Sequence, residues 1–496
     1  MKDLRDFPDA HLRIFDRPPP PNPADVHDVY LIGICGTGMG SLAGLFSQAG
    51  YHVRGSDAAT YPPMSTRLAE MGIGVSEGFS ADNLKSPPDL VIVGNACVPT
   101  HPEATAARDA GMFQMSFPEA LAHFFIGDRH SLVIAGTHGK TTTTGMLIHV
   151  LKHAGLDPGF LVGGLMSNDD TSYSIGSGKY FVVEGDEYDS SYFDKRPKFM
   201  HYKPRTAAVT SMEFDHADIY DDWDDYRTAF EEFAGLVDAD GLLVLNGDDT
   251  NVMKLARHTH ARVSTFGITG SDLDVRAGNI RSSADGTELR LFVGGEPRGD
   301  IRLPSAGHHN VMNALAAITI ALDRGVPLAT IAEAFDSFGG MKRRQEVRAD
   351  IAGVTIVDDF AHHPTAVRET LAASRDRWSG RRIIAVFEPR SNSSRRKAFE
   401  SAYVDAFQNA DIAIISTPPF RHNDRASDFM DVTKITTALA KHHVDASALE
   451  TVDEIVDRLG STMASGDVIV VMSNGGFGGL HDRLIAMLQS ENLPTA

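Results

Sequence analysis

The stretch that decides the fold is Ala135-Gly136-Thr137-His138-Gly139-Lys140-Thr141-Thr142, a loop rich in glycine and threonine. The apolar run Ser131–Ala135 before it predicts a strand, and the residues after it predict a helix that continues through Lys152. Glycines allow backbone N–H groups to curl around phosphate oxygens, and a helix N-terminus adds positive potential there. The sequence therefore predicts a phosphate-binding loop between a strand and a helix.

Two residues of this loop have the positions of nucleotide ligands. Lys140 is placed to reach the β- and γ-phosphates, and the Thr141 hydroxyl is placed to bind Mg²⁺. The general P-loop pattern has a further glycine five residues before Gly139, where this chain has Ile134. The match is therefore to a shorter variant, Gly-Thr-x-Gly-Lys-Thr, and we expect ATP and Mg²⁺ as its cofactors.

Other apolar runs predict strands that alternate with helices along the chain. The strands are expected at residues 29–34, 53–56, 89–94, 180–184, 206–210, 242–245, 354–357, 383–387, 412–415 and 468–472, with helices at 41–50 and 118–125. This alternation is typical of parallel βαβ units. A length of 496 residues corresponds to about three domains. We predict an α/β protein with a Rossmann-like domain (1–128), a central P-loop ATPase-like domain (129–342) and a C-terminal Rossmann-like domain (343–496).

The composition excludes several classes of protein. There are 46 Lys and Arg against 66 Asp and Glu, a net charge of −20, which argues against a general basic face for nucleic acid. The two cysteines, Cys35 and Cys97, provide neither a disulfide framework nor a four-cysteine zinc site. There is no run of about 20 apolar residues and no signal-peptide core in the first thirty residues. We expect a cytoplasmic protein with no membrane or nucleic-acid partner; its oligomeric state is not predicted.

Acidic residues follow two of the predicted strands. Glu184 ends one strand, and the segment Ser211–Asp218 after another contains His216. In a doubly wound sheet both groups lie at the edge where the phosphate loop lies, and Mg²⁺ prefers carboxylate and phosphate oxygens. We therefore predict that Thr141, Glu184 and His216 bind the metal. The other acids nearby are expected to be solvated turn residues: Asp186, Glu187, Asp218, Asp221, Asp222, Asp224 and Asp225.

A second glycine-rich loop, Gly33-x-x-Gly36-x-Gly38-x-Gly40, lies near the amino terminus. Its spacing differs from the dinucleotide fingerprint, although Asp57 is placed to bind a ribose hydroxyl. By itself the loop is compatible with NAD or with a nucleotide-diphosphate head group, because the same amides meet any pyrophosphate.

Four further segments carry polar groups at strand or helix ends. Asn310 lies where a helix begins and is able to bind a base or to act in ordinary capping. Asp358–Pro364 ends a strand, with Pro364 suited to the first helical position. Arg390, after the next strand, has the fork to grip a carboxylate, or else pairs with Glu388 or another nearby acid. The segment Met472–Gly479 is either an anion nest or a tight turn.

Taken together, these motifs resemble the Mur ligase family, the ATP-dependent amide-forming enzymes of peptidoglycan synthesis. The resemblance extends from Tyr30 to about Leu488, and the segments that carry it are 136–142, 184–189, 213–218, 309–315 and 359–364. It implies three domains, in agreement with the count from length. It also implies that the lactyl carboxylate of a muramyl nucleotide attacks ATP, and that an amine then attacks the acyl phosphate.

Two branches of this family accept UDP-N-acetylmuramate. One adds L-alanine, and the other, a recycling branch, adds L-alanyl-γ-D-glutamyl-meso-diaminopimelate. Segments 55–57, 61–66, 193–196, 388–392 and 473–479 resemble the recycling branch. The alanine-adding branch usually has a Gln-Pro-His-Arg type sequence where this chain has Glu388-Pro389-Arg390-Ser391. The resemblance thus implies the tripeptide as the second substrate, with L-alanine as the alternative.

The resemblance also assigns roles to single residues. Lys140, Glu184, His216 and Arg344 are expected to be catalytic. The ATP site is expected to comprise Gly136, Thr137, His138, Gly139, Lys140, Thr141, Thr142, Asn310, Arg344, Asp359 and His362. The UDP-sugar site is expected to comprise Gly36, Thr37, Gly38, Met39, Ser56 and Asp57, and the peptide site Arg390, Ser391 and Asn392.

Two other classes of protein explain only part of these motifs. An NAD-dependent dehydrogenase accounts for the first glycine loop but not for the Gly-Lys-Thr loop or the acidic strand ends. A nucleotide switch or motor ATPase accounts for the phosphate loop but not for the first loop or for Arg390.

Overall fold

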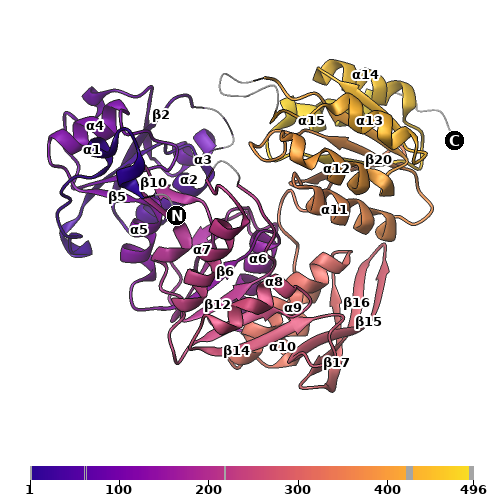
Figure 1. The fold of residues 1–496 in the computed structure, drawn as a ribbon, viewed down its shortest axis with the longest axis horizontal. Helices are drawn as coiled ribbons and strands as arrows, with labels where there is room; N and C mark the ends of the chain where they lie inside the picture. The colour runs from indigo at the N-terminus through magenta and orange to yellow at the C-terminus, as the bar shows by residue number, and fades with distance from the viewer. Residues whose placement is uncertain (1–2, 61, 63, 217–218, 421–427, 491–496) are drawn as a thin grey trace.

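The computed structural model describes residues 3–60, 62, 64–216, 219–420 and 428–490. Tyr61, Pro63, Ala217 and Asp218 of the motifs above lie outside these residues. Five-, ten- and six-stranded sheets follow one another along the described chain. None of the helices described there is both long and apolar enough to cross a membrane. In Figure 1 the N-terminal (indigo) and C-terminal (orange to yellow) parts both lie against the central part.

The first sheet is parallel, with strand order β3-β2-β1-β4-β5. Its strands are β1 (Asp28–Ile32), β2 (His52–Asp57), β3 (Gly74–Glu77), β4 (Leu90–Val93) and β5 (Gln114–Ser116). The helices of this part are α1 (Ala10–Arg13), α2 (Thr37–Gln48), α3 (Met64–Glu70), α4 (Pro102–Asp109) and α5 (Phe117–Leu121). The order reverses direction at β1, so the glycine loop after β1 lies at a switch point of the sheet.

Helix α2 begins earlier than predicted, at Thr37 instead of Ser41. Its glycines serve close packing inside the helix and do not form an open loop. A Cβ added at Gly40 would lie 2.2 Å from the sulfur of Met64, and one at Gly44 would lie 2.1 Å from the ring of Tyr173. Because Tyr173 belongs to the central part, α2 packs tightly against that part.

The central sheet has the order β17-β16-β15-β14-β13-β12-β6-β9-β7-β8. Its strands are β6 (His130–Ala135), β7 (Gly159–Leu161), β8 (Tyr173–Ser174), β9 (Tyr180–Gly185), β12 (Thr206–Val209), β13 (Leu242–Asn246), β14 (Arg262–Gly267), β15 (Val275–Ser283), β16 (Gly286–Val293) and β17 (Glu296–Leu303). A hairpin, β10 (Asp189–Ser191) with β11 (Asp194–Pro197), stands apart. The helices are α6 (Lys140–His153), α7 (Trp223–Gly235), α8 (Thr250–Lys254), α9 (His308–Asp323) and α10 (Leu328–Asp336).

The prediction of parallel βαβ units is correct for β6, β9, β12 and β13, which pair in parallel register. It missed the antiparallel meander β15–β17. This meander has no crossover helices, and its short turns keep consecutive strands adjacent. Its burial alternates along β15 and β16, with one face on the core and one in solvent.

The C-terminal sheet has the order β18-β19-β23-β20-β21-β22 and is parallel except for β18. Its strands are β18 (Glu346–Ile351), β19 (Val354–Asp359), β20 (Ile383–Phe387), β21 (Ile412–Ser416), β22 (Asp445–Leu449) and β23 (Val468–Met472). Its helices are α11 (Pro364–Arg377), α12 (Glu400–Ala406), α13 (Val432–Ala440), α14 (Val452–Thr462) and α15 (Leu480–Ser490).

The hydrophobic cores differ in how they connect the parts. One cluster of buried side chains runs from the first sheet into the central one and includes Phe46, Phe125, Phe181 and Phe230. The C-terminal sheet has its own clusters on its two faces. We propose domains at residues 1–128, 129–342 and 343–496, with the first two sharing a core and the third packed separately.

Candidate active site

The phosphate loop joins β6 to α6, as predicted. Its two glycines have backbone angles that favour glycine, with φ of +130° at Gly136 and +82° at Gly139. A Cβ at Gly136 would lie 2.2 Å from the Thr210 hydroxyl, and one at Gly139 would lie 2.2 Å from Oδ1 of Asn313. The loop is therefore closely enclosed by β12 and α9, and the first N–H groups of α6 remain available for phosphate.

Lys140 folds back over the loop toward Glu187. Its Nζ donates to the Gly136 carbonyl at 2.6 Å and to the two Glu187 carboxylate oxygens at 2.9 and 2.7 Å. The expectation that Glu187 is a solvated turn residue is wrong, because this side chain is fully buried. Burial by itself lowers the pKa of Lys140, and the Glu187 and Asp186 charges raise it above the ordinary lysine value. Lys140 is thus a charged lysine whose side chain is only 14% exposed.

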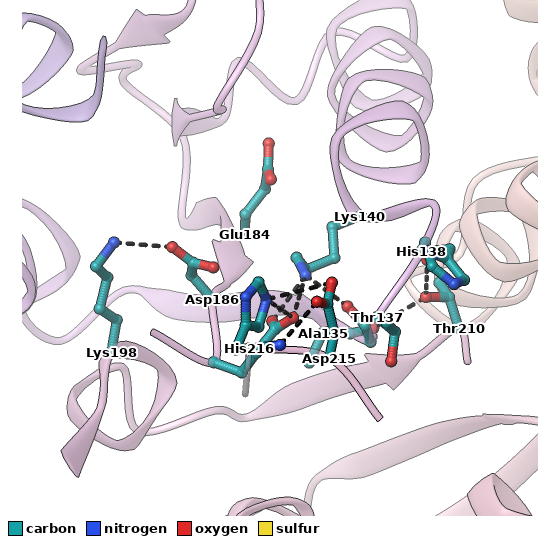
Figure 2. Close-up of polar contacts among 12 residues, drawn as sticks. Ala135, Thr137, His138, Lys140, Glu184, Asp186, Lys198, Thr210, Asp215 and His216 are labelled. Atoms are coloured by element: carbon teal, nitrogen blue, oxygen red, sulfur yellow. Dashed lines mark hydrogen bonds and ion pairs between the residues drawn. The ribbon is translucent and has the colours of Figure 1, made fainter. Parts of the chain in front are cut away.

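Glu187 also binds His216, which comes from the loop after β12. The His216 Nε2 lies 3.0 Å from Oε1 of Glu187, and its ring lies 4.1 Å from the ring of Tyr188 between centroids. Burial lowers the pKa of His216, but the hydrogen bond to Glu187 and the charges of Glu187 and Asp215 together outweigh it and raise the pKa above the usual range. Figure 2 shows His216 and Lys140 converging beside Asp215.

Glu184 stands at the end of β9, on the other side of the phosphate loop. It accepts the Thr141 hydroxyl at 3.1 Å through Oε2 and the Gly163 N–H at 2.6 Å through Oε1. Burial raises the pKa of Glu184, while the Gly163 hydrogen bond opposes this. A carboxylate and a hydroxyl side by side at a phosphate loop are hard oxygen donors that fit Mg²⁺. His216, the third predicted ligand, is bound instead to Glu187, and its role as a ligand stays a prediction.

Arg344 reaches the phosphate loop from the start of the C-terminal domain. Its Nη2 donates to the Thr141 hydroxyl at 3.3 Å, and its guanidinium lies 4.7 Å from the Phe360 ring centroid. Both neighbours have the left-handed backbone, with φ of +60° at Arg343 and +51° at Gln345. A left-handed backbone on each side of Arg344 costs conformational free energy. Backbone strain of this kind clusters at functional sites.

Two further predicted ATP ligands lie at the end of β19 and just after it. Both Asp359 oxygens are used within the C-terminal domain: Oδ2 accepts the Gln345 N–H at 2.8 Å, and Oδ1 accepts the Ala361 N–H at 2.8 Å. Burial raises the pKa of Asp359, against the Arg344 charge. His362 donates through Nδ1 to the Phe360 carbonyl at 3.0 Å, and burial lowers its pKa. Their contact with a ribose stays a prediction.

The remaining residues of the predicted ATP site form the walls of the loop. Thr137 donates to the Glu213 carbonyl at 3.0 Å, and His138 lies 3.2 Å from Oε2 of Glu213. Thr142 is half-buried in the first turn of α6. Asn310 is buried in α9 and donates to the Ala306 carbonyl at 2.8 Å, which is a capping contact. The structure thus leaves both of its predicted roles open, as a base ligand and as a cap.

A cavity of about 300 Å³ opens between the central and C-terminal domains. The predicted peptide-binding residues line one wall, together with other groups of both domains: Tyr188, Asp215, His216, His362, Arg390, Ser391, Asn392, Ser393 and Asn474. Ser391 donates to the Ser394 hydroxyl at 2.9 Å, and Oδ1 of Asn392 accepts from Arg395 at 3.2 Å. Arg390 therefore lies in a loop whose polar side chains are hydrogen-bonded to one another. The same cavity is lined by His216, which is bonded to Glu187.

The first glycine loop lies at the N-terminus of α2. Thr37, Gly38 and Met39 form the first turn, so their N–H groups are free of intrahelical partners, and Gly36 precedes them as the N-cap. Asp57 accepts the Cys35 N–H at 2.8 Å and thereby orders this loop. Ser56 is fully buried and donates to Glu103 at 2.5 Å, away from solvent. A role for Ser56 in UDP-sugar binding stays a prediction.

Glu187 and Glu213 are the site residues that sequence reasoning missed. Both lie beside residues that were selected, Glu187 three positions after Glu184 and Glu213 three before His216. Their residue types gave no signal, because acids after a strand are usually solvated. Only the fold reveals that Lys140 turns toward one of them and that the C-terminal domain contacts the other.

Comparison with known proteins agrees with this geometry. Residues 28–129 match the Mur ligase family catalytic domain, residues 134–321 the Mur ligase middle domain and residues 343–475 the Mur ligase glutamate ligase domain. These segments cover the three sheets and most of the chain.

Individual relatives match along most of their length. The chain is 39% identical to the UDP-N-acetylmuramate–L-alanyl-γ-D-glutamyl-meso-2,6-diaminoheptandioate ligase of Escherichia coli (strain K12), covering 92% of this chain and 97% of the relative. It is 33% identical to the UDP-N-acetylmuramate–L-alanine ligase of Desulforapulum autotrophicum, covering 93% and 99%. The crystal structure of a murein peptide ligase from Psychrobacter arcticus superimposes with a TM-score of 0.72 at 34% identity, covering 94% and 100%. The chain therefore belongs to the Mur ligase family of ATP-dependent, amide-forming ligases.

Proposed function

We propose that this protein joins UDP-N-acetylmuramate to the tripeptide L-alanyl-γ-D-glutamyl-meso-diaminopimelate, with release of ADP and phosphate. The observation that supports the proposal is the cavity between the domains, whose lining includes Arg390 and His216, and His216 shares the Glu187 carboxylate with the phosphate-loop lysine. The 39% and 37% identical relatives named as ligases of this tripeptide support the same substrate. The product belongs to peptidoglycan synthesis, and the tripeptide is a fragment of wall peptide, so the reaction serves recycling.

In the first step we assign the phosphoryl transfer to the phosphate loop. The lactyl carboxylate attacks the γ-phosphorus, the bond to the ADP oxygen breaks, and an acyl phosphate forms. Charge spread over the transferring group is stabilised by Lys140, by Arg344 and by the N–H groups at the start of α6. When ATP binds, the Lys140 ammonium group leaves the Glu187 carboxylate and pairs with phosphate oxygens. It therefore has an anionic partner both before and after ATP binding.

We propose that Thr141, Glu184 and His216 hold Mg²⁺ in the loaded enzyme. The ion supplies charge neutralisation at the phosphate oxygens. Thr141 and Glu184 are already 3.1 Å apart and present oxygens. His216 has to turn from Glu187 and give up a proton to act as a ligand.

The muramyl nucleotide is assigned to the first domain, with its diphosphate on the N–H groups of Gly36, Thr37, Gly38 and Met39. A chain of contacts leads from there to the ATP site. A Cβ on Gly38 would lie 3.6 Å from the ring of Phe117, and Lys198 lies over that ring at 5.8 Å. Lys198 in turn binds Asp186 at 2.8 Å. These contacts link the glycine loop of the first domain to the site that holds Lys140.

In the second step the amine of the tripeptide attacks the acyl carbonyl, and the tetrahedral intermediate collapses to the amide with loss of phosphate. We assign a remote carboxylate of the peptide to Arg390, with Ser391 and Asn392 beside it. Binding at this distance orients the amine and excludes water, which would otherwise hydrolyse the acyl phosphate.

L-Alanine is the second candidate for the amine, favoured by the 33% identical relative named as an alanine ligase. The experiment that separates them is ADP release by the purified protein with UDP-N-acetylmuramate, ATP and either amine. We place the reaction in the cytoplasm, where ATP and UDP-linked sugars are made.

A further inference from the structure

A second group of metal-ligating side chains lies behind the phosphate loop, and the proposed reaction does not use it as a group. His138 of that loop and Glu213 after β12 come from the central domain, and His363 comes from the N-terminus of α11 in the C-terminal domain. One ligand atom from each lies within 4.8 Å of the other two. The group therefore bridges two domains at the point where they meet.

One ring nitrogen of His363 has no hydrogen-bond partner, and the other lies near the Glu213 carboxylate. Nδ1 of His363 accepts the Thr365 N–H at 3.4 Å, so the neutral ring carries its proton on Nε2. This Nδ1 lies 3.8 Å from Oε2 of Glu213, which is a carboxylate oxygen. The Nε2 of His363 is buried and has no hydrogen-bond partner. The His363 ring is 8% exposed, and the donors on its Nδ1 and on the Glu213 oxygen from Thr365 are uncharged, so a cation can replace them.

The protonation states agree with this geometry. Burial, reinforced by the neighbouring His138, lowers the pKa of His363 to about 4, so its ring is neutral at pH 7. Burial raises the pKa of Glu213, but the hydrogen bonds from His138 and Thr365 and the charges of the neighbouring histidines together lower it to about 2. A neutral imidazole and an ionised carboxylate are the forms that bind a metal.

The spacing fits a particular class of ion. Bonds of about 2.0–2.1 Å in a tetrahedral site put neighbouring ligand atoms roughly 3.3 Å apart. Here His138 Nε2 lies 3.2 Å from Oε2 of Glu213, and His363 Nδ1 lies 3.8 Å from it. The Thr365 hydroxyl donates to the same carboxylate at 2.8 Å and orients it from outside. Two imidazoles and one carboxylate select Zn²⁺ or Co²⁺ over Mg²⁺.

We propose that His138, Glu213 and His363 bind one Zn²⁺-class ion that ties the C-terminal domain to the phosphate loop. The ion takes three protein ligands and leaves its fourth position to water. Because His138 belongs to the loop that holds ATP, and α11 moves with the C-terminal domain, the bound ion holds the two domains in one arrangement. The proposed ligase reaction requires the two domains to separate so that substrates enter and products leave. The bound ion therefore inhibits turnover.

A comparable group in the same chain provides a control. Glu119, Asp194 and His201 also have ligand atoms within 4.8 Å of one another. Their carboxylates are already paired, however: Glu119 accepts two hydrogen bonds from Arg17, and Asp194 accepts two from the side chain of Arg196. An arginine fork occupies the lone pairs that a metal would need, so this group is a salt-bridge network and not a metal site.

The test is a Co²⁺ titration of the metal-stripped full-length protein in excess Mg²⁺, followed by visible d–d absorption and by calorimetry with Zn²⁺. His363→Asn keeps a side chain that caps a helix but removes the imidazole, and Glu213→Gln keeps the shape but removes the charge. We expect both to weaken Co²⁺ and Zn²⁺ binding by at least about tenfold. His201→Asn and Glu184→Gln should bind Co²⁺ as the wild type does.

Activity gives a second readout. Zn²⁺ should inhibit ligation by the wild type in excess Mg²⁺, and each variant is compared with and without Zn²⁺ so that its own basal rate does not enter. Inhibition should be relieved in His363→Asn and unchanged in His201→Asn. Equal metal binding by the wild type, His363→Asn and Glu213→Gln would overturn the proposal, as would loss of the Co²⁺ signal in Glu184→Gln. Since binding is measured without nucleotide, its outcome is independent of which substrate the enzyme ligates.

Discussion

Lys140 Nζ lies 2.7 Å from Oε2 of Glu187, and this contact between the phosphate-loop lysine and a fully buried carboxylate organises the site. The same carboxylate binds His216 at 3.0 Å. Without nucleotide, Glu187 supplies the negative charge that the phosphates of ATP supply later. ATP binding therefore exchanges one anionic partner of Lys140 for another.

Glu187→Gln should destabilise the nucleotide-free protein, because Lys140 loses the carboxylate to which its ammonium group is hydrogen-bonded. Breaking a buried pair from one side costs about 3–5 kcal/mol. ATP phosphates restore the counter-charge, so ATP should raise Tm by more in Glu187→Gln than in the wild type. Thermal unfolding with and without ATP measures this. Asp186→Asn is the comparison: its carboxylate is bonded to Lys198 and acts on Lys140 only through its charge, so its ATP shift should be smaller than that of Glu187→Gln. An equal ATP shift in Glu187→Gln and wild type would contradict the exchange.

Lys140→Ala should abolish ligation and leave UDP-N-acetylmuramate binding nearly intact. The lysine serves the transferring phosphoryl group, and the muramyl nucleotide is assigned to the first domain. Loss of one preorganised charge should lower the rate on the order of 10²-fold or more. Single-turnover ADP formation measures the loss of phosphoryl transfer, and calorimetry with the UDP-sugar measures whether its binding is retained. Turnover near the wild-type rate would show that the phosphate-loop assignment is wrong.

Replacing Glu184 or His216 should raise the Mg²⁺ concentration needed for half-maximal activity. Glu184 presents an oxygen next to the Thr141 hydroxyl, and His216 would add a nitrogen ligand. Glu184→Gln and His216→Gln are titrated with Mg²⁺ at saturating ATP, with Asp215→Asn as a neighbouring acid for comparison. An unchanged half-maximal concentration in both variants would remove these residues from the metal site.

The raised pKa of His216 predicts opposite pH trends for stability and for metal use. A raised pKa in the folded state means that its stabilising contribution is complete below the unfolded value, about 6.5, and is lost as pH rises through the folded value. The difference in unfolding free energy between wild type and His216→Gln should therefore shrink from about pH 6 to pH 9. The Mg²⁺ requirement should fall over the same range, because the metal competes with the proton. A stability difference that grows with pH would contradict the assignment.

Local patterns predicted most of the frame. The strands predicted at 383–387 and 468–472 are β20 and β23, with the same first and last residues. A short apolar run between polar turns is compatible only with a buried strand. The start of α2 was misplaced because glycine is a poor helix former, and its close packing against Met64 and Tyr173 is visible only in three dimensions. The meander β15–β17 was missed because charged and polar residues interrupt its apolar ones and leave no continuous apolar run.

The site was predicted where chemistry follows from position along the chain. Lys140, Thr141 and Glu184 meet because a loop after one strand and the end of the next share a sheet edge. Contacts between domains have no such local signal in the sequence. The contacts of Thr365 and His363 with Glu213 are therefore visible only in the structure.

The central claim is that the protein selects a tripeptide, and the comparison of two amines on two proteins tests it most directly. Wild type and Arg390→Ala are assayed for kcat/KM with L-alanyl-γ-D-glutamyl-meso-diaminopimelate and with L-alanine, at saturating ATP and UDP-N-acetylmuramate. A remote carboxylate held by Arg390 should give the wild type a much higher kcat/KM for the tripeptide, and Arg390→Ala should erode that preference mainly by raising the KM of the peptide. Equal or better use of L-alanine by the wild type would contradict the account.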